Sequence, residues 1–274
     1  MIIVNEKRVE DIQVTDKGGD MLQVNEVYKG STSVWWRIRP FSSLTWGEIH
    51  SLSNRIRTLE LSGDDLYSYV SNAYGLNVGD TKTLTLTNGD TYTTRIIDFN
   101  DSTTDDGGKN GIRLEFVELY ETTYPMNSTN TNAGGFISSK MFTETLPSIF
   151  NLFPDDIKPY VRKTHIMRHG GYVDSSGKTE FTADTELFTY SEYEIFGSTS
   201  YALQEGVWLK YWKEHNSSEY RKKYMGGGII YVNSWWLSSA YRSYTDSFAS
   251  VDRVGGLDHY GASNSHGVGV CLSI

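Results

Sequence analysis

Two histidines four positions apart are the first candidates for metal chemistry in this 274-residue chain. His165 and His169 would share one face of a strand, and Asp174 follows closely enough to supply a third ligand. The chain nevertheless lacks the His-Glu-x-x-His motif of zinc enzymes. We therefore expect no metal, and we interpret the pair as polar positions on a strand edge beside Arg168.

Carboxylates are the second group that could do chemistry. Three adjacent acidic pairs stand at residues 64–65, 105–106 and 155–156. A glycosidase needs two carboxylates at a fixed separation across a cleft, whereas adjacent pairs in loops or at helix starts are usually solvated. A glycan-active enzyme stays open as an alternative, and it predicts a concave pocket with two facing carboxylates and a raised pKa.

Motifs for nucleophilic, thiol or phosphate chemistry are missing. The chain has no Gly-x-Ser-x-Gly sequence, and its glycine run at 226–228 lacks the lysine of a phosphate-binding loop. Cys271 is the only cysteine, which excludes intrachain disulfides, cysteine-based zinc sites and paired-thiol redox chemistry. We predict that the protein is not an enzyme, with no catalytic residue, metal or cofactor.

The last 38 residues, 237–274, differ in composition from the rest of the chain. They contain no Lys, Glu, Gln, Met or Trp, where random placement would give about six. Two interpretations stay open. One is a surface whose residues are exchanged for binding, and the other is a Gly- and Ser-rich β end that lacks long polar side chains.

This stretch has the chemistry of a contact surface, because antibody paratopes also combine Tyr with Ser, Gly and Asn. We expect Val251, Val254 and Leu257 to pack inward, and at least one of the adjacent Trp235 and Trp236 to lie in the core. His266 could contact a ligand or cap a turn. The predicted ligand-binding residues are Tyr241, Arg242, Ser243, Tyr244, Asp246, Ser247, Phe248, Asp252, Arg253, Asp258, His259, Tyr260 and Asn264.

The composition of the whole chain limits its partners. A net charge of −9 argues against a general nucleic-acid binder. With 19 Tyr and 7 Trp, the aromatic content suits a β-rich fold with tyrosine-lined contact surfaces. Apolar runs such as 229–232 are too short to span a membrane, and the start turns polar at Asn5 without a signal-peptide apolar region. We expect no nucleic-acid partner and no membrane insertion.

Local patterns predict the elements that must position these residues. Thr45 and Glu48 have capping-box spacing at the start of a partly helical stretch, residues 44–66. Asn88-Gly89 between alternating runs predicts a β-hairpin on a type I′ turn. The remaining predictions are strands at 2–4, 11–14, 22–24, 33–38, 81–87, 90–99, 112–119 and 161–167, helical turns at 138–157, helices at 191–196 and 202–215, and β structure after residue 228.

Several short motifs occur in a familiar order: residues 45–49, 78–84, 95–99, 134–139, 146–147, 187–192, 194–197, 236–239 and 267–274. Over about residues 42–274 the chain resembles a family of uncharacterised domains of gut bacteria and their phages. The end of that domain resembles the C-type lectin fold of formylglycine-generating enzymes. It also resembles the variable proteins of diversity-generating retroelements, such as the phage major tropism determinant. Ser238-Ser239-Ala240 and Gly269-Val270 depart from the Arg-Ser-Pro and Arg-Pro usual there.

The resemblance implies an α+β fold, in which residues 1–40 form a small N-terminal β segment and residues 41–274 a C-type-lectin-like domain with β-hairpins and short helices. The first 36 residues resemble phage tail proteins that dock by β-strands. Retroelements of this kind mutate template adenines, and each residue type present after position 236 can arise from an asparagine codon by changing only adenines. A variable region at about 238–266 follows.

The function implied is non-catalytic binding of a host cell-surface protein or glycan receptor by a phage tail-tip protein or adhesin. Such a protein would reside in the virion or at a cell surface. The resemblance also implies a homo-oligomer, with a trimer favoured, that docks on other tail proteins through its N-terminal segment. A fixed structural tail or baseplate component is the alternative, and it predicts residues 241–260 buried against another chain.

Overall fold

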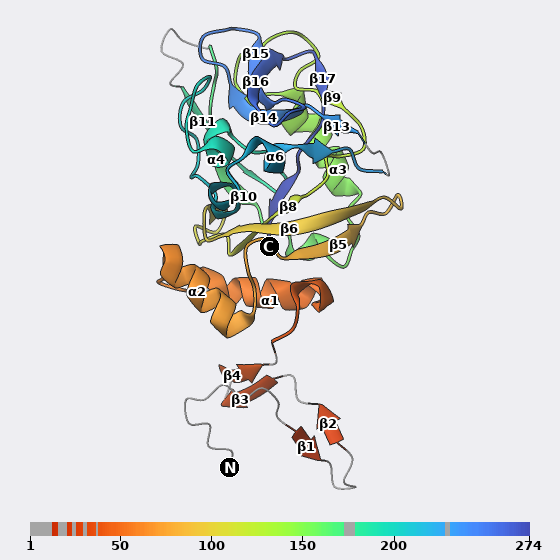
Figure 1. Ribbon diagram of the computed structural model, residues 1–274, viewed down its shortest axis with the longest axis vertical. Coiled ribbons are helices and arrows are strands. Elements are labelled where there is room, and N and C mark those ends of the chain that lie inside the picture. Colours follow the sequence, from red (N-terminus) through yellow and green to blue (C-terminus); the bar gives the residue numbers. More distant parts are fainter. Residues whose placement is uncertain are drawn as a thin grey trace.

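Figure 1 shows the computed structural model of the chain, which describes residues 38–172, 179–227 and 231–274 with their side chains. Before residue 38 it describes the backbone of β1 (Gln13–Thr15), β2 (Met21–Gln23), β3 (Glu26–Lys29) and β4 (Thr32–Trp36). Antiparallel pairing joins β1 to β2 and β3 to β4. The strands predicted at 11–14, 22–24 and 33–38 are confirmed apart from their ends. β3 was missed, and residues 2–4 lie outside the described part.

The predicted capping box starts the first long helix, α1 (Trp46–Arg57). The Thr45 hydroxyl accepts the N–H of Glu48 at 3.3 Å, and the Glu48 carboxylate accepts the N–H of Thr45 at 2.8 Å. The predicted helical stretch continues past a break as α2 (Gly63–Tyr74), which ends at Gly75 with φ of 69°. A left-handed residue after a helix favours glycine, so the helix stops there.

A four-stranded antiparallel sheet in the order β18-β8-β6-β5 forms the centre of the fold. Its strands are β5 (Thr81–Thr85), β6 (Thr91–Phe99), β8 (Ile112–Phe116) and β18 (Cys271–Ser273). Every residue of β8 is buried. In Figure 1 the helices α1 and α2 lie beside this sheet, at the end of the domain away from β15 and β16.

The β5–β6 hairpin is present, but the predicted type I′ turn is wrong. That turn needs positive φ at both central residues, and here only Gly89 has it, at 95°. The Gly89 N–H donates to the carbonyl of Leu86 at 2.9 Å, and the Leu86 N–H donates to that of Asp90 at 2.8 Å. This is a three-residue connection with glycine at its last position, a geometry that spares Asn88 a left-handed backbone.

Smaller sheets complete the β structure. β10 (Thr164–His169) pairs with β7 (Thr103–Thr104) and with β11 (Glu180–Thr185), while β14 (Trp235–Ala240), β15 (Ser247–Val251) and β16 (Leu257–Gly261) form a sheet in that order. Two further pairs join β9 (Tyr124–Pro125) to β17 (Ser265–His266) and β12 (Lys223–Tyr224) to β13 (Val232–Asn233).

The remaining helices are short. They are η1 (Phe41–Ser43), the π-helix η2 (Met141–Thr145), α3 (Leu146–Asn151), η3 (Lys158–Tyr160), α4 (Glu192–Phe196), α5 (Lys210–Glu214) and α6 (Ser218–Arg221). The mixture of helices and antiparallel strands is an α+β fold, as predicted.

The helix predicted over residues 202–215 is wrong for its first eight residues. Gly206 has φ of 72°, where a Cβ would overlap the carboxylate of Glu194. Leu209 is extended, and only α5 is helical. The left-handed glycine breaks the helical path, and residues 202–209 form an irregular segment packed on α4.

The core contains charges as well as apolar side chains. Trp235 and Trp236 are both fully buried, which confirms that at least one belongs to the core. Beside them lies a chain of ion pairs, which we call the buried charge network. It runs from Asp101 to Arg113 (2.6 Å), from Arg113 to Glu194 (3.0 Å) and from Glu194 to Arg168 (3.1 Å). These side chains are at most 4% exposed, so the network ties β8 to α4 and β10 in the interior.

Within the described ranges, no helix combines the length and apolar character needed to cross a membrane.

Candidate functional site

The loop between β14 and β15, residues 241–246, exposes the side chains of its four central residues, 242–245. Arg242, Ser243 and Tyr244 are exposed, and Tyr241 and Asp246 are half-buried. Beyond the loop, the other predicted site residues that reach solvent are Arg253 and Asn264, which are exposed, and Asp252, Asp258, His259 and Tyr260, which are half-buried. We call residues 241–246 the display loop.

Burial corrects several of the sequence predictions. Phe248 is 0% exposed and Ser247 is 6% exposed, so neither presents its side chain to a ligand. Both faces of β15 are covered, and the alternation expected of a half-exposed strand fails there. Val254 shows the opposite error. It was expected to pack inward but is 65% exposed, because it lies in the turn between β15 and β16.

The solvent-exposed part of the predicted variable region starts later than its predicted first residue, 238. Ser238 and Ser239 are fully buried in β14 and bonded to the core. The Arg168 guanidinium donates to the Ser238 hydroxyl at 2.6 Å, and the Ser239 hydroxyl donates to the Glu205 carboxylate at 2.5 Å. These two serines hold β14 in place, and display begins at Tyr241.

One buried side chain outside the predicted region holds the display loop. The Asn132 side-chain nitrogen lies 2.9, 2.7 and 2.9 Å from the carbonyl oxygens of Tyr241, Tyr244 and Ser247. Its main-chain N–H donates to the carbonyl of Thr245 at 2.9 Å. All of these acceptors are main-chain atoms, so this support does not depend on which side chains the loop carries.

A second support comes from the segment after α4. The main-chain N–H of Arg242 donates to the carbonyl of Tyr201 at 3.0 Å. That segment is itself fixed by Glu192, whose carboxylate accepts the N–H groups of Tyr201 and Ala202 at 3.1 and 2.9 Å. Burial raises the pKa of Glu192 even though these hydrogen bonds lower it.

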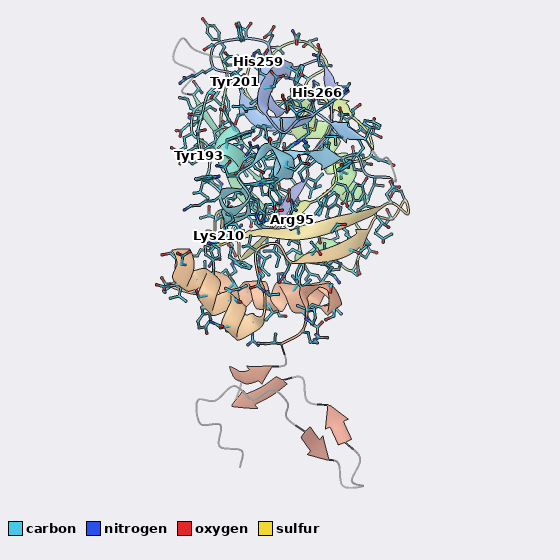
Figure 2. The ribbon with its side chains drawn as sticks, viewed as in Figure 1. Arg95, Tyr193, Tyr201, Lys210, His259 and His266 are labelled. Carbon is cyan, nitrogen blue, oxygen red and sulfur yellow. The ribbon has the colours of Figure 1, made fainter. Side chains whose placement is uncertain are left out.

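Four rings meet where the display loop, β16 and the 198–202 segment come together. Tyr241 lies 4.8 Å from Tyr201, 4.7 Å from Tyr244 and 4.7 Å from His259, measured between ring centroids. We call these four residues the aromatic cluster. Tyr244 is 52% exposed, so the cluster offers ring surface to solvent. Figure 2 shows Tyr201 and His259 together at this end of the domain.

The opposite face of β16 carries a second aromatic group, because adjacent residues of a strand point to opposite sides. Tyr260 and His266 have ring centroids 4.2 Å apart, and the His266 ring meets Trp236 edge-on at 4.7 Å. Burial, together with the charge of Arg253, lowers the pKa of His266 to about 4. His266 is therefore a neutral packing residue at neutral pH.

The β15–β16 turn is fixed by its own residues. The Asp252 carboxylate accepts the N–H groups of Val254 and Gly256 at 2.9 and 2.7 Å. Gly255 has φ of 83°, and a Cβ there would overlap the carbonyl oxygen of Ser218. The Asp252 side chain, predicted to bind a ligand, forms the turn instead.

Sequence reasoning missed Tyr201, Asn132 and Glu192, which lie 40 or more residues before Tyr241, the first of the predicted ligand-binding residues. Asn130 was missed as well, and its amide lies 3.2 Å from the Asp246 carboxylate. Local sequence gives no signal for these contacts, because they depend on long-range packing. The high tyrosine content of the chain was the one sequence feature that indicated a further tyrosine in this contact surface.

The histidine pair has protein partners. His165 pairs with Asp184 at 2.8 Å on the sheet surface. The main-chain N–H of His169 donates to the Glu205 carboxylate at 2.7 Å, and the Nδ1 atom of its ring lies 3.5 Å from the same carboxylate. Asp174 lies outside the described residues. Across the described part of the chain, no group of three or more His, Cys, Asp or Glu side chains is arranged to hold a metal ion.

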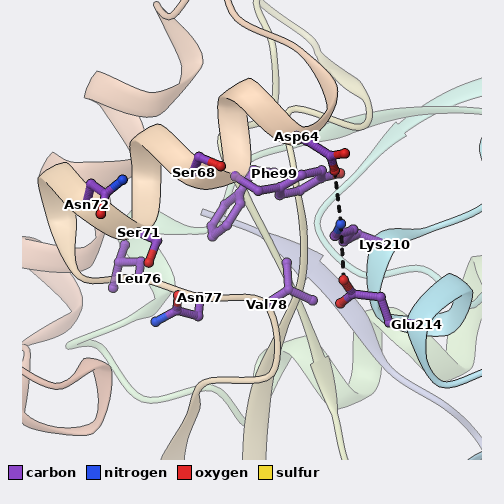
Figure 3. A pocket seen from close by; sticks show the side chains of 11 residues that line it. Asp64, Ser68, Ser71, Asn72, Leu76, Asn77, Val78, Phe99, Lys210 and Glu214 are labelled. Carbon is purple, nitrogen blue, oxygen red and sulfur yellow. Dashed lines mark hydrogen bonds and ion pairs between the residues drawn. The ribbon is translucent and has the colours of Figure 1, made fainter.

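A pocket of about 440 Å³ lies between α2 and α5 (Figure 3). Lys210 stands at one end, 3.3 Å from Asp64 and 3.1 Å from Glu214. Asp98 binds two of the residues that line the pocket, because it accepts the Tyr67 hydroxyl and the main-chain N–H of Lys210, both at 2.7 Å. Burial and the charge of Asp101 raise the pKa of Asp98 to about 6.

This arrangement differs from the acid–base pair of a glycosidase. Both carboxylates that line the pocket are bound by the same lysine. Asp98, whose pKa is raised, is 3% exposed and does not line the pocket. A glycosidase needs a free acid and a free carboxylate facing one bond.

Residues 117–274 match the family described as Domain of unknown function (DUF6273). The chain belongs to the DUF6273 family. Neither the curated proteins nor the solved structures contain a match to it. The matched segment includes the display loop and the aromatic cluster. It also includes Asn132 and Glu192, which support the loop together with Tyr201.

The fold extends beyond the DUF6273 segment. Its last strand, β18, pairs with β8, which ends at residue 116, just before the match begins. Ser53 of α1 also donates a hydrogen bond to the carbonyl of Ile274. The central sheet is therefore built from one strand of the DUF6273 segment, β18, and three strands that precede the segment, within residues 81–116.

Proposed function

We propose that the protein is a non-catalytic receptor-binding protein of a phage tail tip or an adhesin. The display loop and the aromatic cluster would contact a protein or glycan on a host cell. A C-type-lectin-like fold and diversification by a retroelement are parts of this proposal. The cluster offers flat ring area with little rotamer entropy to lose, which suits a contact surface.

One observation carries the proposal: hydrogen bonds to its main chain hold the display loop, while the side chains of residues 242–245 face solvent. Asn132 and the carbonyl of Tyr201 contact only main-chain atoms of residues 241–247. Exchange of Arg242, Ser243 or Tyr244 would leave these bonds intact. A diversified surface requires such support, whereas a fixed interface does not.

The same proposal predicts the oligomeric state, the partners and the location of the protein. A single contact surface of this size would bind weakly, and several copies would raise the avidity. We therefore expect a homo-oligomer, with a trimer favoured, attached to other tail proteins through the N-terminal segment. The expected location is the virion or a cell surface.

The decisive test is to sequence the DNA downstream of the coding sequence. A diversified protein requires a near-copy of the segment encoding residues 237–274, with adenines at the differing positions and a reverse transcriptase gene nearby. The structure sharpens this expectation: the differences should fall on codons of exposed residues, such as Arg242 and Tyr244, and spare that of Phe248. Without such a copy, a fixed structural tail component would become the better account.

A further inference from the structure

A groove of about 790 Å³ runs along the free edge of β5, at the end of the domain away from β16 (Figure 1). One wall is residues 43–47, the other is residues 82–85, and Pro154, Asp156 and Tyr160 complete it. Four consecutive strand residues line this groove. Successive side chains of a strand point to opposite faces, so what the four share is the main-chain edge of β5.

Hydrogen bonds at the two ends of β5 show which main-chain groups face the groove. The Leu86 N–H donates to Asp90, and the Ile96 N–H donates to the carbonyl of Asp80, so even-numbered residues pair with β6. Thr87 instead donates away from β6, to the carbonyl of Leu152 at 2.8 Å. In an antiparallel pair this alternation continues along the strand, so the N–H and C=O groups of Thr83 and Thr85 point into the groove.

These groups have no bonds within the described part of the chain. β5 pairs with β6 alone there, and no other hydrogen bond involves the main chain of Thr83 or Thr85. An unpaired strand edge is a template for one more strand. The opposite wall, residues 43–47, faces this edge across the groove, which leaves room for a single extended segment rather than a second globular sheet.

The groove also contains a half-buried cation, Lys82, which forms no ion pair with a carboxylate of the described residues. Lys82 donates to the carbonyl of Ser42 at 3.2 Å and lies 5.3 Å from the centroid of the Trp46 ring. Burial lowers the pKa of Lys82, whereas the more distant Asp156 and Glu48 raise it. A carboxylate brought beside Lys82 would stabilise its charge in this partly dry setting.

We propose that this groove, the β5 groove, binds an extended segment of a partner protein as an additional strand on β5, with an Asp or Glu of that segment beside Lys82. Main-chain bonds to Thr83 and Thr85 would supply affinity, and the acidic side chain would supply selectivity. A partner bound here leaves the display loop free, because the two surfaces lie at opposite ends of the domain (Figure 1).

Selection of random decapeptides displayed on phage against the immobilised full chain tests the proposal. The enriched peptides should carry an acidic residue among β-branched ones. Thr83→Pro removes the main-chain N–H that faces the groove, together with the threonine side chain, at a position where an edge strand tolerates proline. It should weaken binding of an enriched synthetic peptide about tenfold, the value of one hydrogen bond.

Two variants and one amide measurement complete the test. Thr83→Val keeps the main chain and should bind within about twofold of wild type, whereas Lys82→Met should lose about tenfold or more. Hydrogen exchange of the Thr83 and Thr85 amides should slow when the peptide binds, and that of Lys82 and Leu84 should not change. The proposal is overturned if no acidic peptide is enriched, or if the enriched peptides bind Thr83→Pro as tightly as wild type.

Discussion

The buried charge network and the display loop both contain charged side chains, but the fold uses them in opposite ways. In the network, each charged group of Asp101, Arg113, Glu194 and Arg168 is bound by another side chain. In the display loop, the bonds to Asn132 and Tyr201 involve main-chain atoms, and Arg242 extends into solvent. The identity of the side chain therefore matters for folding in the first region and is available for binding in the second.

The difference has an electrostatic cause as well. Burial opposes ionisation of Glu194, but Arg113 and Arg168 overcome it and hold the pKa of Glu194 below its usual value. A buried charge depends on its partners in this way, while an exposed charge is stabilised by water. Substitutions in the two regions should consequently differ by several kcal/mol in their effect on folding.

The largest expected effect follows from Glu194→Gln. Removing this charge leaves Arg113 and Arg168 buried without their shared anion, which we expect to cost about 3–5 kcal/mol of unfolding free energy. Urea denaturation measures it, with Glu144→Gln as the control. Glu144 is 66% exposed and forms only a helical ion pair with Lys140, so its loss should cost less than about 0.5 kcal/mol. Equal effects of the two variants would break the comparison.

Asn132→Ala should have the next largest effect. It leaves the carbonyls of Tyr241, Tyr244 and Ser247 without their shared donor, at an expected cost of about 2 kcal/mol. Asn132→Asp, which keeps the shape but cannot donate, should be at least as damaging. Urea denaturation and hydrogen exchange of the 241–247 amides measure both effects. The exposed Asn264→Ala is the control, and unchanged exchange in Asn132→Ala would refute the support we assign to this residue.

A pH effect is expected from His266, at the edge of the proposed binding surface. Its pKa in the folded state is about 4, below its usual value of 6.5. Above pH 6.5 the ring is neutral in both states and has no effect. As the pH falls from 6.5 to 4, the unfolded chain gains a proton that the folded chain resists, so stability is lost across this window.

The size of this effect is small because the ring is only partly buried. After allowance for solvent screening, we expect about 1 kcal/mol between pH 7.5 and pH 4.5. His266→Phe keeps the contacts with Trp236 and Tyr260 and removes the proton. Comparing the pH dependence of urea denaturation for the two proteins isolates His266 from the other histidines. Parallel curves would show that the ring is not held neutral by the fold.

The sequence predicts features that depend on neighbours in the chain. The capping box at Thr45 and the hairpin around Gly89 were both correct, because a few adjacent residues determine each. The α+β class, which the family resemblance implied, was correct as well. The type of the hairpin turn was wrong, since two turns accept the same Asn-Gly pair. The exposure of the Arg242 and Tyr244 side chains to solvent was predictable because both residues lie in a polar loop.

Long-range contacts could not be predicted. Asn132 lies 109 residues before Tyr241, and the supporting bonds reach main-chain atoms that carry no sequence signature. Phe248 was predicted to lie on the surface because, like the nearby tyrosines, it would supply flat aromatic contact area, but both faces of β15 are covered by other elements. Which tyrosines lie outside and which phenylalanines lie inside depends on packing between distant segments, and a single sequence does not specify it.

The smallest expected effects lie in the display loop itself, and they are the sharpest test of the comparison. Arg242→Ser and Tyr244→Ser should each change the unfolding free energy by no more than about 0.5 kcal/mol, because both side chains are exposed and no main-chain bond is lost. Four residues further on, Phe248→Ser should cost about 3–5 kcal/mol, because it leaves a cavity in the core. Urea denaturation of the three variants decides the matter. A loss above about 1.5 kcal/mol in Tyr244→Ser would mean that the aromatic cluster is part of the folding core, and residues 241–246 would then be a poor place for exchangeable contact residues.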